Sequence, residues 1–396
     1  MQNQVMIPKA WVLEFDDVGW DNGRDLRLLG KGSRSGLPRY HALEDYQQLA
    51  DIGEAAGMSL NIALCLGDWD KDNLLRGEVG ITHDPYGWDR KSEIDVEKFE
   101  KYRDVIDNSP YVDYSIHGLL HGSYDENGKL LHEKEYFDYV EVEGEGKKLV
   151  LRSEEDFKRR LDIFFKIYNS WGFKKPIKVF ISPCGLGMAS QKEISRIARE
   201  LYKRGVRYWT NGGFYFDGSI KVINGVACVK KSFPLCPDGK KFDVPWDAYD
   251  IDPETFPDYI SNYDDSCIFG MHWTNLLRFN PKKNPEQVPL WADYVKRQGE
   301  IYGLVNAKDI TEAANQQFYY EMANVTYGEN FVEIDLSALE GNTVDCHKNE
   351  FFISIKRGIA PSSVGGGEIA LYEEKRDFIT YKIIHSGFGR IRIAFS

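Results

Sequence analysis

The sequence predicts an α/β barrel followed by a smaller, all-β domain. In roughly the first 310 of the 396 residues, short apolar runs alternate with helical patterns, which is typical of βα units. Ionisable residues collect directly after the apolar runs, and α/β barrels carry their active sites at the carboxyl ends of their strands. Beyond about residue 315, apolar and polar residues alternate in short segments separated by turn signals.

The first part reads as strands and helices in turn. Predicted helices lie at 41–57, 96–106, 154–171, 191–204 and 285–302, and Ser153 is placed to cap the third of them. Predicted strands lie at 10–15, 60–66, 112–116, 177–181, 206–209 and 267–271. Two stretches interrupt the alternation: a long loop over 70–93 and a hairpin excursion over 122–150.

The second part is expected to be a small sandwich-like domain over 315–396, after a barrel over 1–314. Its predicted strands lie at 331–336, 350–356, 368–373, 378–385 and 390–395. The pattern leaves three roles open for this domain: it binds glycan, mediates dimerisation, or braces the barrel.

Charge and composition exclude several classes of partner. A net charge of −12 repels phosphate backbones and anionic lipids, so we expect neither nucleic acid nor a membrane as partner. No segment approaches the ~18 consecutive apolar residues of a membrane span. The N-terminus has no basic region followed by an apolar stretch, so a cytoplasmic location is expected. None of the 6 cysteines forms a C-x-x-C pair, which argues against a disulfide framework or a thiolate zinc site.

Two adjacent carboxylates, Asp16 and Asp17, follow the first predicted strand. Neighbouring carboxylates repel each other unless a cation neutralises one of them. A divalent metal ion would do so and would leave the first carboxylate free to act as a base. The alternative is a solvated turn.

Histidines supply the other candidate ligands. His117 and His121 follow the third predicted strand, and two His four residues apart face one way on a helical turn. Imidazole suits zinc, nickel, cobalt or iron, although a chance pair is the alternative. His272 ends a later strand, where it is a candidate general acid or a structural, hydrogen-bonded His.

Taken in order, these elements resemble the motifs of the polysaccharide deacetylase family, the chitooligosaccharide-deacetylase homology domain. The family motifs are T-F-D-D-G, H-(S/T)-x-x-H, an R-P-P-Y-like third, a Trp-containing fourth and L-x-H. Here residues 14–19 read Glu-Phe-Asp-Asp-Val-Gly and 117–121 read His-Gly-Leu-Leu-His. Residues 180–185 read Phe-Ile-Ser-Pro-Cys-Gly and 270–272 read Gly-Met-His. The resemblance covers about residues 8–310.

The resemblance implies a distorted (β/α)7 barrel and a role for each residue. Asp16 would be the catalytic base and His272 the general acid. Asp17, His117 and His121 would hold one divalent metal ion, with zinc expected and nickel, cobalt or iron as alternatives.

Three positions depart from the family motifs. Ile181 stands where the family has the Arg that tethers the base, and Arg207 is a candidate substitute. Cys184 replaces the Tyr whose backbone N–H contributes to the oxyanion hole, and a backbone N–H survives that change. Gly118 replaces a Ser or Thr, which is expected to loosen the His loop.

Tryptophans near predicted strand ends are candidates for stacking on sugar rings, and Trp69, Trp209 and Trp273 with Cys184 are the predicted substrate-binding residues. Packing in the core or at the rim is the alternative for each indole. Trp246 and Asp247 are candidates for the fourth motif.

The sequence thus predicts a metal-dependent hydrolase that acts on a carbohydrate or another small acetylated substrate. The first alternative is a hydrolase of a non-sugar amide with the same fold. The second is a carbohydrate-binding scaffold that lost its activity with the Arg of the third motif.

Overall fold

The protein is described from a computed structural model. The described residues are 4–21, 37–125, 127–132, 134–144, 146–183, 190–211, 220–232, 248–255 and 266–395.

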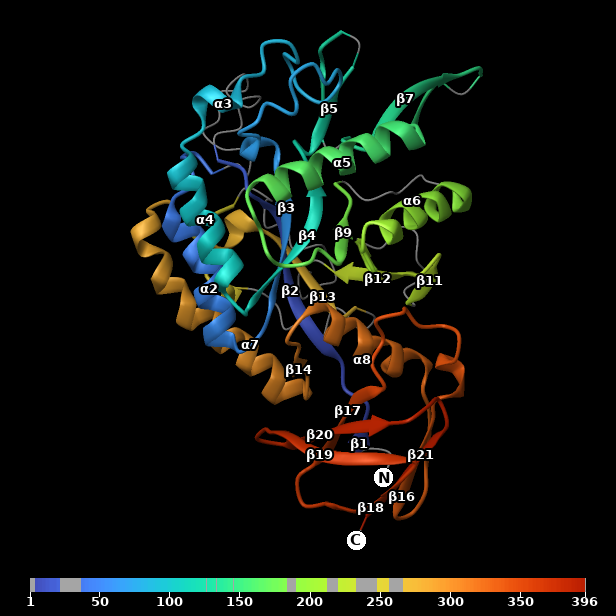
Figure 1. Ribbon diagram of the computed structural model, residues 1–396. Coiled ribbons are helices and arrows are strands. Elements are labelled where there is room, and N and C mark those ends of the chain that lie inside the picture. Colours follow the sequence, from blue (N-terminus) through green and yellow to red (C-terminus); the bar gives the residue numbers. More distant parts are fainter. Residues whose placement is uncertain are drawn as a thin grey trace.

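In this part of the chain, parallel strands close into a seven-stranded barrel with helices outside it (Figure 1). Around the ring the order is β10-β9-β4-β3-β2-β13-β12, and β12 pairs with β10 to close it. The strands are β2 (Ala10–Val18), β3 (Leu60–Cys65), β4 (Val112–Gly118), β9 (Val179–Ile181), β10 (Tyr208–Asn211), β12 (Val226–Ser232) and β13 (Ile268–His272). The predicted barrel is confirmed. Sequence analysis had not identified β12.

The helices at the five predicted positions bury one face each, as their patterns predict. The helices are α2 (Leu43–Ala56), α3 (Arg90–Glu93), α4 (Val96–Asn108), α5 (Glu154–Ser170), α6 (Gln191–Lys203), α7 (Val288–Tyr302) and α8 (Ile310–Met322). The predicted cap of α5 is present, because the Ser153 side chain accepts a hydrogen bond from the backbone N–H of Asp156. No helix in the described ranges is both long and apolar enough to cross a membrane.

The excursion after β4 consists of two short hairpins. β5 (Gly122–Tyr124) pairs with β6 (Leu130–His132), and β7 (Phe137–Val142) pairs with β8 (Gly146–Leu151). Both stand beyond the end of the barrel toward which β4 points (Figure 1). The predicted hairpin excursion therefore lies at the carboxyl end of the strands.

The C-terminal region forms two four-stranded antiparallel sheets. One has the order β15-β16-β21-β18 and the other β1-β17-β20-β19. The strands are β1 (Val5–Met6), β15 (Asn324–Tyr327), β16 (Phe331–Asp335), β17 (Glu350–Lys356), β18 (Pro361–Gly365), β19 (Gly367–Glu374), β20 (Phe378–His385) and β21 (Arg390–Phe395). The N-terminal strand β1 joins the second sheet, although the sequence pattern placed it with the barrel.

Helix α8 connects the two units, and the predicted boundary at residues 314 and 315 falls inside it. Its Gln316 amide donates to the carbonyls of Pro8 and Phe352 and accepts from the N–H of Phe352. One apolar cluster runs from the barrel strands through α8 into both antiparallel sheets. The sheets lie below the amino ends of the barrel strands, away from the hairpins (Figure 1). This position favours the bracing role among the three that the sequence left open.

Candidate metal centre and active site

The end of β2 presents two adjacent carboxylates to the same region. In a regular strand, neighbouring side chains point to opposite faces, so Glu14 and Asp16 share the face that lines the barrel interior. The pairing of β2 with β3 is irregular between Phe15 and Val18, and Asp17 has a φ of +71°. This bulge and left-handed backbone break the alternation and allow Asp17 to reach the site beside Asp16.

Asp17 lies between two imidazoles. Its Oδ1 atom is 3.3 Å from Nε2 of His117 and 3.5 Å from Nε2 of His121. Both separations exceed the usual length of a hydrogen bond. Two donors on one tetrahedral zinc ion, each at about 2.1 Å, stand about 3.4 Å apart. Each histidine therefore lies at a distance from Asp17 that two ligands of one cation would have.

His117 is oriented for coordination through Nε2. Its Nδ1–H donates to the backbone carbonyl of Ile181 over 2.9 Å, which leaves the lone pair on Nε2. Neither Nε2 of His117 nor Oδ1 of Asp17 makes a hydrogen bond within the described residues, although both atoms are buried. Buried polar atoms rarely lack a hydrogen-bond partner, and a metal ion would satisfy both of these atoms.

The electrostatics at His117 also favour a cation. Burial acts to lower the pKa of this imidazole, but the carboxylates of Asp16 and Asp17 outweigh it and raise the pKa to about 9. The carboxylates therefore attract positive charge to this point, whether it is carried by a proton or by a metal ion.

A buried carboxylate from the hairpin excursion holds the His loop. Glu135 accepts hydrogen bonds from the backbone N–H groups of Leu119, Leu120 and His121, at 2.8, 3.0 and 2.7 Å. His121 itself has a φ of +59°. The two histidines thus sit on a strand end and a loop, and the predicted helical turn is wrong.

Gly118 is required by this arrangement. Its φ is +139°, and a Cβ there would stand 2.5 Å from Oε2 of Glu135. The Ser or Thr of the family motif would collide with the carboxylate. We predicted that Gly118 loosens the loop, but the loop is held by Glu135 in the space that Gly118 leaves.

The candidate base Asp16 is tethered by Lys231, on β12. The ammonium donates to both Asp16 oxygens at 2.7 Å and lies 3.0 Å from Oε1 of Glu14. Burial acts to raise the pKa of Asp16, but the charge of Lys231, with that of His117 and His272, holds it below its usual value. The pKa of Lys231 is raised because the two carboxylates outweigh its burial. Asp16 and Lys231 therefore form a charged pair.

Two departures from the family motifs accompany this lysine. Ile181 offers no guanidinium at the third motif, and Gly270 stands where the fifth motif has Leu. A Cβ at Gly270 would overlap the methylene stem of Lys231. Arg207, the substitute considered from the sequence, instead pairs with Asp345 at 2.6 Å, and its pKa is raised by this contact despite partial burial.

Beneath the pair, a polar layer crosses the barrel interior. Glu14 accepts from the side chains of Asn61 at 2.6 Å and Thr210 at 3.1 Å, and Ser115 donates to Asn61 at 2.6 Å. Burial is the main cause of the raised pKa of Glu14. The layer fixes the position of Glu14, which in turn holds Lys231.

His272 ends β13 directly beside Asp16, with which it is in register. Its backbone N–H donates to the Asn275 side chain at 3.0 Å. The next residue, Trp273, stacks on His41 with ring centroids 3.8 Å apart, and His41 is hydrogen-bonded to Asp45. The predicted general acid thus lies in the same site as the predicted base.

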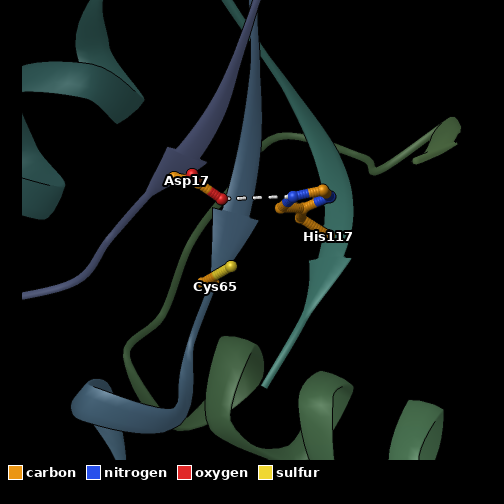
Figure 2. Close-up of side chains that lie close together, drawn as sticks. All are labelled: Asp17, Cys65 and His117. Atoms are coloured by element: carbon orange, nitrogen blue, oxygen red, sulfur yellow. Dashed lines mark ion pairs between the residues drawn. The ribbon is translucent and has the colours of Figure 1, made fainter. Parts of the chain in front are cut away.

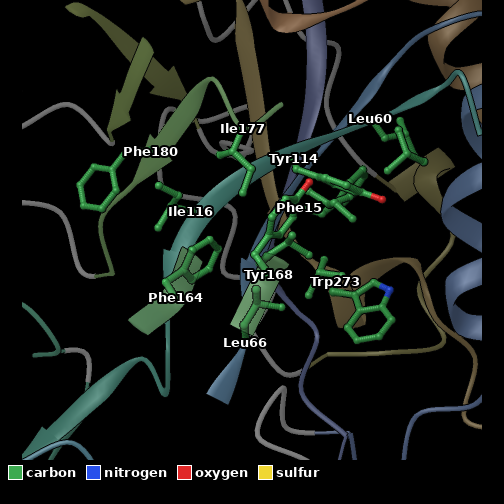
Figure 3. Packing of buried hydrophobic residues seen from close by; sticks show 14 of the residues in the cluster. Phe15, Leu60, Leu66, Tyr114, Ile116, Phe164, Tyr168, Ile177, Phe180 and Trp273 are labelled. Carbon is green, nitrogen blue, oxygen red and sulfur yellow. The ribbon is translucent and has the colours of Figure 1, made fainter. Parts of the chain in front are cut away.

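The three indoles that were predicted to bind substrate are packed in the protein interior. Trp69, Trp209 and Trp273 are each at most 1% exposed and belong to the barrel's main apolar cluster, part of which, including Trp273, is drawn in Figure 3. A buried ring has no free face for a sugar, so the packing alternative accounts for all three. Cys184, Trp246 and Asp247 lie outside the described residues.

Sequence analysis missed Glu14, Lys231 and Glu135. The first two had a usable signal, because Glu14 is two residues before Asp16 and Lys231 follows the short apolar run at 226–229. Glu135 had none, since only the folding of the excursion brings it to the His loop.

The sequence matches no known family model and no curated protein. Among solved structures, the chain is similar to Agd3, described as a novel carbohydrate deacetylase, with a TM-score of 0.51 and 10% identity over 98% of this chain. This chain spans 65% of the length of that protein. At this identity the likeness shows the fold alone.

Two weaker matches are glycoside hydrolases. A GH30 endoxylanase from Clostridium papyrosolvens C71 matches with a TM-score of 0.34 and 9% identity, over 99% of each chain. A GH27 β-L-arabinopyranosidase from Geobacillus stearothermophilus matches with a TM-score of 0.36 and 10% identity, over 98% of each chain.

Proposed function

We propose that this protein is a metal-dependent hydrolase that removes acetyl groups from an acetylated saccharide. The observation that carries the proposal is the convergence of Asp17, His117 and His121, with a tethered carboxylate, Asp16, next to them. Similarity of fold to a carbohydrate deacetylase supports the choice of substrate class.

Asp17, His117 and His121 would hold one divalent cation through one oxygen and two nitrogens. This donor set suits zinc, with nickel, cobalt or iron as alternatives. When bound, the cation would lower the pKa of a water molecule and polarise the acetyl carbonyl.

The remaining steps fall to the protein's own side chains. Asp16, held in one orientation by Lys231, takes a proton from the attacking water, whose oxygen bonds to the acetyl carbon. The C–N or C–O bond then breaks, and His272 gives a proton to the leaving nitrogen or oxygen. The products are acetate and the free amine or hydroxyl. The backbone N–H at Cys184 remains our prediction for the oxyanion contact.

Lys231 bears on the inactive-scaffold alternative. That alternative rested on the missing Arg of the third motif, and Lys231 supplies a buried cation to the same carboxylate. The non-sugar amide alternative keeps the same residues and differs only in substrate.

The proposal is tested by acetate release from a panel of N- and O-acetylated sugars, with small cyclic amides assayed in parallel. The zinc-loaded protein should release acetate, and a chelator should abolish the release. Asp16→Asn should lower kcat by at least about a hundredfold, whereas Asp104→Asn, an exposed carboxylate on α4, should not.

Two outcomes would overturn the proposal in different ways. Full activity in Asp16→Asn would remove Asp16 from the role of base. A zinc-loaded protein that hydrolyses only the cyclic amides would establish the alternative substrate class.

A further inference from the structure

Cys65 stands between two of the candidate ligands. It is the last residue of β3, which lies between β2, the strand of Asp17, and β4, the strand of His117. Parallel neighbours end at the same edge, so the three side chains lie close together there, as Figure 2 shows. Cys65 is buried and is not in a disulfide.

The three residues form a compact group of donors. One atom from each of Asp17, Cys65 and His117 can be chosen so that all lie within 4.8 Å of one another. Asp17 is 3% exposed and His117 is 2% exposed, and the facing atoms Oδ1 and Nε2 make no hydrogen bond among the described residues. The thiol therefore faces two buried donors that a metal ion would satisfy.

We propose that the Cys65 sulfur is a fourth protein donor to the metal ion held by Asp17, His117 and His121. The inference rests on the proposed metal centre and adds a ligand to it. On binding, the S–H proton leaves to solvent and a bond forms between sulfur and metal.

A thiolate donor has two chemical consequences. Sulfur is a soft ligand, so it favours zinc and cobalt over harder cations such as manganese and magnesium. The thiolate and the Asp17 carboxylate together neutralise a divalent ion, which a site this deeply buried favours. Zinc also accepts a fifth ligand, so a position remains for water.

The competing account is a small apolar side chain that fills space beside a three-ligand site. The two accounts differ in whether sulfur touches the metal, which spectroscopy reports without any measurement of activity.

The test uses the full chain loaded with one equivalent of cobalt(II). The wild type should show an intense near-ultraviolet charge-transfer band from thiolate to cobalt. Cys65→Ala should bind cobalt without this band and should bind zinc at least about tenfold more weakly. Cys267→Ala, which removes another buried thiol, should keep the band and the affinity.

A second measurement needs no variant and covers the case in which Cys65→Ala does not fold. X-ray absorption of the zinc-loaded wild type should contain one sulfur at about 2.3 Å among nitrogen and oxygen neighbours. Bound metal with only nitrogen and oxygen neighbours would overturn the role of Cys65 and leave the three-ligand centre intact. A wild type that binds neither metal would overturn the metal centre itself.

Discussion

The ammonium of Lys231 lies 2.7 Å from each carboxylate oxygen of Asp16, although the two residues are 215 positions apart in the sequence. The same ammonium lies 3.0 Å from Glu14. One buried cation thus serves two carboxylates that share a face of β2. The tether of the candidate base therefore comes from β12, not from the end of β9.

Replacing Lys231 with Met should impair both stability and turnover. Breaking a buried ion pair leaves an uncompensated charge and costs about 3–5 kcal/mol, which urea unfolding would measure. Loss of the tether should lower kcat about tenfold to a hundredfold with little change in KM. Lys231→Arg should keep more activity than Lys231→Met.

Lys230 provides the matched control. It precedes Lys231 on the same strand and points to the opposite face, so Lys230→Met should leave kcat nearly unchanged. Equal losses in the two variants would mean that a general change in β12, and not the Asp16 contact, causes the effect.

The Glu135 carboxylate should be needed for metal affinity. Glu135→Gln places an amide donor against N–H groups that now donate to a carboxylate, at a cost of about 1–3 kcal/mol. The loop that carries His121 would shift, and zinc affinity should fall about tenfold to a hundredfold in a competition titration.

Glu141→Gln changes an exposed carboxylate on β7, in the same excursion, and should have no such effect. If Glu135→Gln bound zinc as tightly as the wild type, the hydrogen bonds to residues 119–121 would have no part in ligand placement.

At acid pH, protonation of Asp45 should weaken the stacking of His41 on Trp273, the residue after His272. Burial acts to raise the pKa of this carboxyl, but its bonds to Arg39 and His41 outweigh it and hold the pKa below its usual value. Asp45 therefore contributes stability that is complete above about pH 4 and is lost as the pH falls further. At neutral pH, Asp45→Asn should cost about 1.5–3 kcal/mol.

Urea unfolding from pH 3 to pH 7 measures both effects. Asp45→Asn should show a shallower loss of stability below pH 4 than the wild type. Glu54→Gln, an exposed position on the same helix, should follow the wild-type curve. Parallel curves for Asp45→Asn and the wild type would rule out this residue as a source of the acid sensitivity.

Replacing Trp209 distinguishes a role in core packing from a role in stacking on a sugar ring. The ring is 1% exposed and packs edge-on against Phe180 with centroids 5.9 Å apart. Trp209→Phe should lower the free energy of unfolding by about 1–3 kcal/mol while KM changes by less than about twofold. A large rise in KM without loss of stability would support the stacking role.

The sequence was most informative where chemistry follows a long strand. The run that forms β2 leads directly into Asp16 and Asp17, and the strand-like alternation Val-Asp-Tyr-Ser-Ile at 112–116 likewise precedes His117. Position and residue type there were enough to predict a metal site. Five of the C-terminal strands were also visible, because their alternation is regular, whereas the short strands β15 and β18 were not predicted.

The missing parts depend on contacts between distant segments. The strand β12 is a short apolar run followed by two lysines, and its pairing with β10 and β13 decides which lysine enters the barrel. Glu135 lies in an excursion whose path no local pattern specifies. Cys65 was not considered as a ligand, because the rule applied to cysteines looks for pairs of thiols and not for one thiol beside a histidine.

The central claim is that Asp17, His117 and His121 bind a single metal ion. A zinc titration of the metal-free protein, followed by calorimetry or a competing chelator, tests it most directly. The account predicts one tight site in the wild type and in His83→Ala, which removes an exposed histidine from the loop over 70–93. Asp17→Ala and His117→Ala should stay folded and lose that site. Tight, stoichiometric zinc binding in either variant would contradict the account.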